Sequence, residues 1–154
     1  GAQFQIFFPA VQARRTEIPV LPVASASSGT ETILLAEDEE GVRRYAQETL
    51  ERRGYRVLAC SHGPEAIERA RQHSGSIHLL ITDAVMPEMG GAELAALFAD
   101  CRPGVPVLCM SGYSAMVWPG ADTQASYLQK PFTPTVLLTR VRSLLDRGEV
   151  ARPV

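Results

Sequence analysis

The chain has few cysteines, and their spacing matches no familiar framework. Cys60, Cys101 and Cys109 are odd in number and show neither a CxxC pattern nor histidine-linked spacing, which excludes a disulfide scaffold and a zinc module. Two of them lie in or beside apolar runs, where a free cysteine packs as a small hydrophobic residue. We therefore expect a reducing, cytoplasmic environment for this segment.

Long apolar runs and positively charged clusters are also missing. No apolar run approaches the roughly 18 residues that a membrane span needs, so we expect no direct membrane contact by this segment, although a longer parent protein can be anchored. The formal net charge is −2, which gives no electrostatic case for nucleic-acid binding. The arginines of the first helical segments are scattered at spacings that suit exposed helix faces: Arg43, Arg44, Arg52, Arg53, Arg69 and Arg71.

What is present is enough for one domain with extra residues at its ends. The chain has 154 residues, of which 45% are apolar and 21% charged, as in folded globular proteins. Residues 10–31 are rich in Pro, Ala, Ser, Thr and Gly, which is typical of a linker. Before them, the alternation in QFQIFFP predicts a single strand, which is not stable alone. We therefore divide the chain into a remnant strand (1–9), a linker (10–31), a domain (32–146) and a tail (147–154).

Within the domain, short apolar runs alternate with amphipathic segments. Strands are predicted at TILLAED, RVLAC, IHLLITD, VPVLCMSG and ASYLQ, and helices at GVRRYAQETLERRG, GPEAIERARQH, AELAALFADC and TPTVLLTRVRSLLDRG. This alternation predicts an α/β fold, a doubly wound five-stranded parallel sheet sandwiched by helices.

The helical patterns also predict which residues face the core. In the first helix the buried face is expected to carry Val42, Tyr45, Ala46, Thr49 and Leu50, with Gly54 ending the helix. Pro64 suits the first turn of the second helix. In the last helix the inward residues are expected to be Val136, Leu137, Val141, Leu144 and Leu145.

One segment departs from the regular pattern. The stretch GYSAMVWPGADTQASYLQ between Ser111 and Lys130 is short for a loop, a helix, another loop and a strand, and Pro119 and Gly120 interrupt it. The fourth helix is therefore predicted to be short, broken or disordered. The apolar residues 116–118 then form either an exposed partner surface or a cover over the core.

Chemically active side chains gather where the predicted strands end. Since the carboxyl ends of parallel strands share one edge, we expect a common site there, formed by Glu37, Asp38, Asp83, Ser111 and Lys130. Unit charges about 4 Å apart interact at roughly 4 kcal/mol, so three carboxylates this close would repel one another without a cation. Oxygen ligands without histidine or cysteine favour Mg²⁺.

These residue types suit phosphoryl transfer. A carboxylate can act as a nucleophile towards phosphorus, an ammonium can neutralise the transferring oxygens, and a hydroxyl such as that of Ser111 can bind another. Taken singly, each residue has a plainer interpretation, since an aspartate at a strand end is more often a helix cap and a Lys-Pro pair is usually a turn. Their joint placement favours the catalytic interpretation.

Four motifs carry a resemblance to the receiver domains of response regulators. They are ILLAEDEE, LLITDAVMPEMGG, VLCMSGY and YLQKPF, in this order between Thr32 and about Asp146. The resemblance implies a flavodoxin-like fold in which Asp83 accepts the phosphoryl group, and it places Mg²⁺ on Glu37, Asp38, Asp83 and the backbone carbonyl of Val85. It further implies that Ser111 senses the phosphoryl group, that Lys130 pairs with it, and that the Lys130–Pro131 peptide is cis.

The same resemblance implies a conformational switch. After phosphorylation the Ser111 hydroxyl would move inward, and an aromatic side chain on the last strand, here Tyr127, would turn from outside to inside. The alternative is that Tyr127 is a half-buried edge-strand aromatic without a signalling role.

The segment before the linker suggests the parent protein. GAQFQIFFPAV resembles the last strand of the ATP-binding domain of sensor histidine kinases, which would make the chain the C-terminal receiver of a hybrid kinase; an unrelated tail is the alternative. The expected partner is a histidine kinase domain or a histidine phosphotransfer protein. By itself this segment would be a phosphoacceptor with at most self-dephosphorylation.

Other function classes stay open at this point. They are a stand-alone response regulator, a metal-dependent phosphatase and a partner-binding scaffold. A phosphatase favours an acid two residues after the nucleophile, where Val85 stands, and a scaffold would not need all five site residues.

Overall fold

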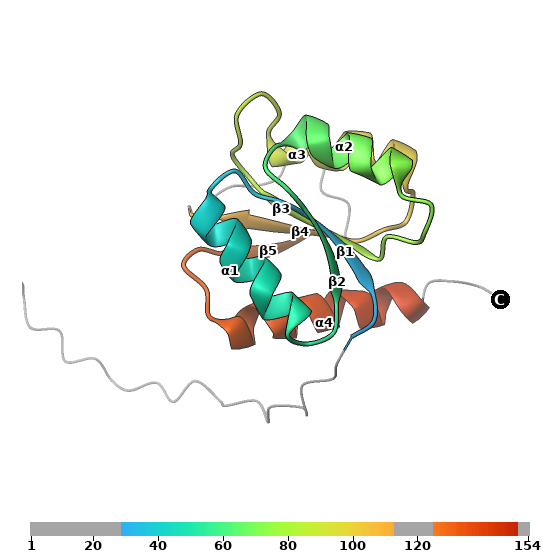
Figure 1. Ribbon diagram of the computed structural model, residues 1–154. Coiled ribbons are helices and arrows are strands. Elements are labelled where there is room, and N and C mark those ends of the chain that lie inside the picture. The colour runs from blue at the N-terminus through green and yellow to red at the C-terminus, as the bar shows by residue number, and fades with distance from the viewer. Residues whose placement is uncertain (1–28, 113–124, 151–154) are drawn as a thin grey trace, which may run out of the picture.

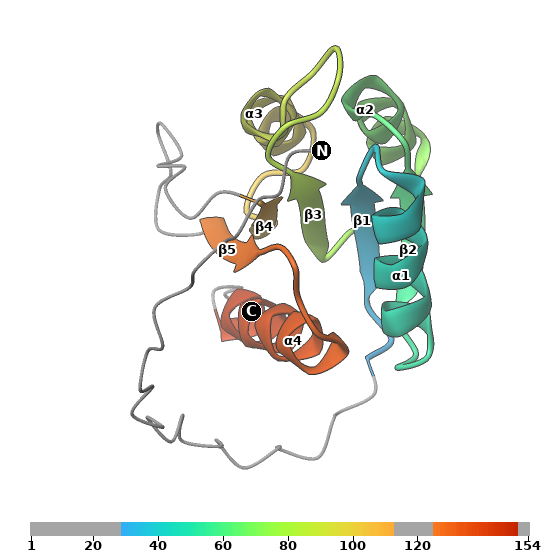
Figure 2. The same ribbon diagram turned by 90° about the vertical axis from the view of Figure 1, so that its left-hand side faces the viewer.

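The computed structural model describes residues 29–112 and 125–150 and shows a single parallel sheet. Its strands stand in the order β2-β1-β3-β4-β5; they are β1 (Thr32–Ala36), β2 (Arg56–Cys60), β3 (Leu79–Asp83), β4 (Val107–Ser111) and β5 (Ala125–Gln129). The described ranges contain four helices: α1 (Glu40–Glu51), α2 (Gly63–Gln72), α3 (Gly91–Cys101) and α4 (Pro134–Val150). Helices α1 and α4 cover one face, and α2 and α3 the other (Figures 1 and 2). The predicted fold class is confirmed.

Several predictions concern residues outside the described ranges. The short or disordered fourth helix would fall at 113–124, the apolar residues 116–118 lie in the same stretch, and the remnant strand and most of the linker lie before residue 29. Helix α4 is the predicted last helix, and it runs through Val150, past the expected domain end at residue 146.

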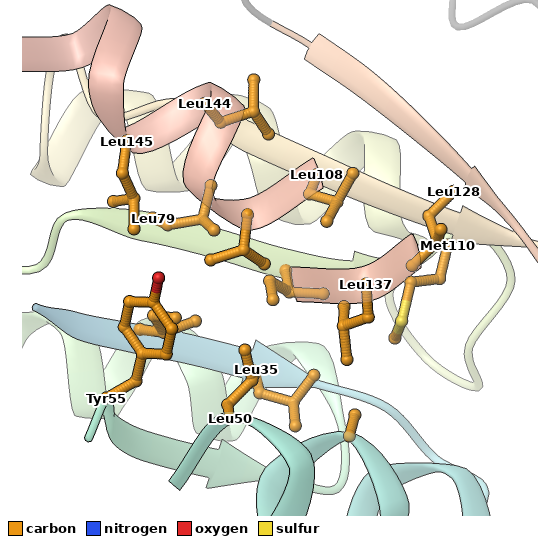
Figure 3. Packing of buried hydrophobic residues seen from close by; sticks show 14 residues of the cluster. Leu35, Leu50, Tyr55, Leu79, Leu108, Met110, Leu128, Leu137, Leu144 and Leu145 are labelled. Atoms are coloured by element: carbon orange, nitrogen blue, oxygen red, sulfur yellow. The ribbon is translucent and has the colours of Figure 1, made fainter. Parts of the chain in front are cut away.

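The central strands are buried on both faces, as their continuous apolar runs predict. In β1, Ile33 and Leu35 pack towards α1 and α4, whereas Leu34 and Ala36 pack towards α2 and α3. The first of these two cores is shown in Figure 3, where leucines of α4 meet residues of β1, β3 and β4. Within the described ranges no helix is long and apolar enough to cross a membrane.

Local signals set the helix ends. His62 caps α2, since its Nδ1 accepts from the Glu65 N–H at 3.2 Å while the Glu65 carboxylate accepts from the Ser61 N–H at 2.8 Å. Pro64 lies in the first turn of α2 and Gly54 adopts φ +91° in the turn after α1, as predicted.

Two apolar residues lie farther out than predicted. Tyr45 is 41% exposed and Val136 is 46% exposed. The buried stripe of α4 consists of Leu137, Val141, Leu144 and Leu145. Val136 is turned about 100° from Leu137 around the helix axis, which places it on the flank of this stripe.

Candidate functional site

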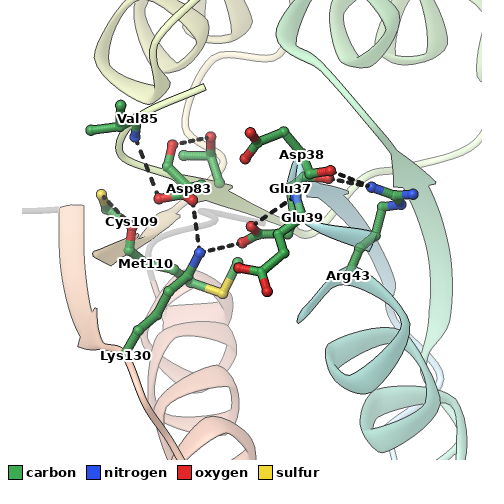
Figure 4. A network of polar contacts seen from close by, with 10 residues as sticks. Glu37, Asp38, Glu39, Arg43, Asp83, Val85, Cys109, Met110 and Lys130 are labelled. Carbon is green, nitrogen blue, oxygen red and sulfur yellow. Dashed lines mark hydrogen bonds and ion pairs between the residues drawn. The ribbon is translucent and has the colours of Figure 1, made fainter. Parts of the chain in front are cut away.

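Three carboxylates meet at the carboxyl edge of the sheet. Glu37 and Asp38 directly follow β1, and Asp83 is the last residue of the neighbouring strand β3. One carboxylate oxygen from each residue lies within 4.8 Å of those of the other two (Figure 4). The structure therefore brings together the acidic residues that the sequence analysis placed in one site.

Lys130 joins this group from the position directly after β5, which lies two strands away from β3 in the sheet. Its Nζ lies 2.7 Å from Glu37 Oε2 and 2.7 Å from Asp83 Oδ2. Its backbone N–H donates to the Ser111 carbonyl at 2.8 Å, and the peptide to Pro131 is cis, as the resemblance implied. One ammonium thus bridges the ends of β1 and β3.

Burial disfavours the charged forms of the side chains in this site. Glu37 is fully buried, and burial raises its pKa to about 7, with the nearby Asp83 charge adding to the rise and Lys130 opposing it. Burial alone would lower the pKa of Lys130, but its contacts with Asp83 and Glu37 raise it overall, so the ammonium stays charged. Two carboxylates share one ammonium, and a third carboxylate stands beside them. A divalent cation would offset the remaining negative charge.

The donor set fits a hard cation. All three side chains present carboxylate oxygens, the ligands that Mg²⁺ prefers, and two of the three are already held in place by Lys130. Asp83 is 14% exposed at its side chain, and Asp38 is exposed, so the site is open to solvent on one side.

The backbone of Asp83 is fixed as well as its side chain. Its carbonyl accepts from the Thr82 hydroxyl at 3.0 Å, and the first residue of α3, Gly91, lies directly against this carbonyl. A Cβ atom at Gly91 would stand 2.2 Å from the Asp83 oxygen, so only glycine fits. Gly91 was not among the predicted site residues, although the GG pair at the start of α3 is a signal for a close approach.

Val85 contacts the site through its N–H. This group donates to Asp83 Oδ1 at a long 3.4 Å, and the Val85 side chain is 62% exposed. The role of its carbonyl as a metal ligand stays a prediction.

Ser111 and Tyr127 lie on the neighbouring strands β4 and β5. Ser111 is buried, and the Tyr127 hydroxyl is buried beside the side chains of Cys109 and Ser111. Burial raises the pKa of Tyr127 above its usual value. The two residues that were expected to form a switch are therefore close together, beside the strand end that carries Lys130.

Arg43 corrects one expectation. It was predicted to be one of the solvated arginines, yet it is half-buried and its Nη1 donates to the carbonyls of Glu37 at 2.7 Å and Asp38 at 3.2 Å. The other five arginines of that group are exposed. Helical spacing alone could not separate Arg43 from Arg44, because only the fold brings the β1–α1 loop within its reach.

A doubly wound parallel sheet with an acidic cluster and a lysine at its carboxyl edge defines a receiver-type phosphoacceptor domain. The family model for the response regulator receiver domain matches residues 33–142, more than half of the chain, and the chain belongs to this family. It is therefore a receiver domain of two-component signalling.

Relatives include a kinase and a stand-alone receiver, both from Brucella abortus (strain 2308). The chain is 32% identical to the sensor kinase CckA over 97% of its own length but only 17% of that protein's length. It is 37% identical to the response regulator receiver protein CpdR, with 73% of this chain and 95% of CpdR covered.

Solved structures show the same fold. The receiver domain of the hybrid histidine kinase CckA matches with a TM-score of 0.66 and 36% identity, over 74% of this chain and 98% of that one. A receiver protein from Sinorhizobium medicae WSM419 matches with a TM-score of 0.71 and 31% identity, over 79% and 99% of the two chains. Receiver domains in general bind Mg²⁺ and interact with histidine kinases or phosphotransfer proteins, and the acidic cluster is compatible with this.

Proposed function

We propose that Asp83 accepts a phosphoryl group from a phosphohistidine. The observation that carries the proposal is the Lys130 ammonium, 2.7 Å from both Glu37 and Asp83 within the acidic cluster. An ammonium at this position can neutralise a phosphoryl oxygen next to the attacking carboxylate.

In this reaction an Asp83 carboxylate oxygen forms a bond to phosphorus. The bond between phosphorus and the imidazole nitrogen of the donor breaks, and its electron pair stays on that nitrogen. Lys130 neutralises the charge on a phosphoryl oxygen, and the Ser111 hydroxyl binds another.

Glu37, Asp38 and Asp83 would hold Mg²⁺, with the Val85 carbonyl as a further ligand from the family resemblance. When bound, the metal supplies positive charge that offsets the phosphoryl oxygens. The buried Glu37 and the half-buried Asp83 share one ammonium, that of Lys130, and this excess of negative charge supports the assignment.

Ser111 and Tyr127 would transmit phosphorylation to the surface. Their proximity on β4 and β5 supports a coupled movement, in which Ser111 responds to the phosphoryl group and Tyr127 changes its position.

A hybrid histidine kinase is the parent protein that we propose. The similarity to CckA extends over 97% of the chain, so it includes most of the residues that precede the stretch matched by the receiver family model, 33–142. This supports the division into a kinase strand remnant (1–9), a linker (10–31), the receiver (32–146) and a tail (147–154). The donor or acceptor would then be a histidine kinase domain or a phosphotransfer protein, in the cytoplasm.

The test is incubation with acetyl phosphate and Mg²⁺, followed by intact mass. Wild type should gain one phosphoryl group, whereas Asp83→Asn, or wild type without metal, should gain none. Asp100→Asn is the matched control, since Asp100 is an exposed aspartate on α3 away from the acidic cluster, and it should react like wild type. Equal labelling of Asp83→Asn and wild type would reject the assignment of the phosphoacceptor.

A phosphatase is the second class to consider. It favours an acid two residues after the nucleophile, and that residue is the exposed, apolar Val85. Lasting addition of a phosphoryl group to Asp83, rather than multiple turnover of the substrate, would separate the two.

A further inference from the structure

Arg43 belongs to α1, but its guanidinium acts on the loop that carries two of the three carboxylates. Its Nη1 donates to the Glu37 carbonyl at 2.7 Å and to the Asp38 carbonyl at 3.2 Å (Figure 4). These two carbonyls belong to the peptide units on either side of the Asp38 Cα atom. Since each peptide unit is planar, one guanidinium nitrogen restrains both planes that set the direction of the Asp38 side chain.

Asp38 depends on this restraint more than its neighbours do. Glu37 and Asp83 are each held by Lys130 at 2.7 Å. The Asp38 carboxylate is exposed, and among the residues that the structure describes no hydrogen bond or ion pair holds it. Its place in the cluster is therefore set by the backbone, and the backbone is held by Arg43.

We propose that Arg43 is a positioning residue of the metal site, which orients the Asp38 carboxylate towards the cation. This inference rests on the proposed function, because it assumes that the acidic cluster binds Mg²⁺. Partners that orient metal ligands without touching the metal typically contribute 10- to 100-fold in affinity. Removing the guanidinium should weaken Mg²⁺ binding by about tenfold, at the low end of this range because the loop has other contacts.

Charge alone predicts the opposite change in Mg²⁺ affinity when the guanidinium is removed. A guanidinium near a cation site repels the cation, so deleting it without any positioning effect would strengthen Mg²⁺ binding. The direction of the change therefore separates positioning from simple electrostatics.

The experiment is an amide NMR titration with Mg²⁺ on wild type, Arg43→Met and Arg44→Met. Arg44 is the matched control, because it is the next residue of the same helix and carries the same charge. Its side chain is 69% exposed and pairs with Glu48 on the surface at 3.8 Å. The dissociation constant should rise about tenfold in Arg43→Met and stay equal or fall slightly in Arg44→Met. Thermal unfolding of the three proteins is also measured in EDTA, because a purely structural role of Arg43 would change Tm without changing Mg²⁺ affinity.

Equal or tighter Mg²⁺ binding by Arg43→Met would overturn the inference and leave the proposed function standing, provided that wild type binds Mg²⁺ and is phosphorylated. Wild type without Mg²⁺ binding would overturn both. If Arg43→Met is unfolded in EDTA, Arg43→Gln decides instead, since it keeps a polar group at this half-buried position but lacks the guanidinium that reaches both carbonyls. Weaker binding than wild type supports the inference, and equal binding rejects it.

Discussion

At the scale of single residues, burial decides which thiols can react. Cys60 and Cys109 are buried, and burial raises the pKa of each thiol to about 12, with the charge of Asp83 adding to the rise at Cys109. Cys101, at the end of α3, is half-exposed. Because the thiolate is the reactive form, the two buried thiols are protected by both access and ionisation.

We therefore expect Ellman's reagent at pH 8 to label one thiol in the native protein and all three in denaturant. Cys101→Ser should abolish the fast reaction. Rapid native labelling of that variant would show that the core around Cys109, next to Asp83, opens more readily than its packing indicates.

At the scale of elements, the start of α3 packs directly against the end of β3. A Cβ atom at Gly91 would stand 2.2 Å from the Asp83 carbonyl oxygen, a backbone atom that cannot move without moving the proposed phosphoacceptor. Gly91→Ala should therefore cost about 1–3 kcal/mol of stability, as for other overpacked sites, and slow phosphorylation.

Gly41→Ala is the control for this change. Gly41 lies in the first turn of α1, and a Cβ atom there would meet nothing within 4 Å. This variant should be more stable than wild type by up to about 1 kcal/mol, because alanine favours helix. Urea denaturation measures both, and similar effects of the two substitutions would contradict the close contact at Gly91.

The elements themselves were predictable, whereas contacts between a side chain and a distant backbone were not. The strand ends at Asp83 and Lys130 followed from apolar runs and from the rule that parallel strands share one carboxyl edge. Gly91 packs against a backbone carbonyl, and Arg43 donates hydrogen bonds to two others. Because every residue has a carbonyl group, no sequence pattern identifies these partners. Tyr45 was predicted correctly as a member of α1 but wrongly as buried. Periodicity shows which side of a helix is apolar, but it does not show how much of that side the neighbouring elements cover.

At the scale of the whole molecule, one ion pair joins the two ends of the domain, away from the acidic cluster. Arg142 of α4 donates from Nη1 to Glu31 Oε1 at 2.6 Å and from Nε to Asp146 Oδ1 at 2.7 Å. Glu31 directly precedes β1, at the edge of the sheet opposite the acidic cluster. This pair therefore joins the start of the receiver to its last helix.

Its contribution should depend on pH. Burial alone would raise the pKa of Glu31, but the hydrogen bond from Arg142 and its charge bring the pKa below the ordinary value of 4.5. A carboxyl with a lowered pKa in the folded state stabilises the protein above its unfolded pKa, and this stabilisation is lost as the pH falls through 4.5 and then through the lowered value.

Glu31→Gln should thus be less stable than wild type by about 1–2 kcal/mol at pH 7, and the difference should shrink below pH 4.5. This is less than the roughly 1.5–3 kcal/mol of a hydrogen bond to a charged group, because the glutamine oxygen can still accept from Arg142. The quantity to compare is the difference in stability between variant and wild type, with both measured in EDTA. Glu37, whose pKa burial raises to about 7, titrates in both proteins, so its contribution to the pH dependence cancels in this difference. Glu48→Gln is the control, since Glu48 pairs with Arg52 at 3.3 Å on the exposed side of α1 and should contribute less than about 1 kcal/mol at any pH. A constant difference between pH 3.5 and 7 for Glu31→Gln would mean that packing of this side chain, and not its charge, joins α4 to the start of the domain.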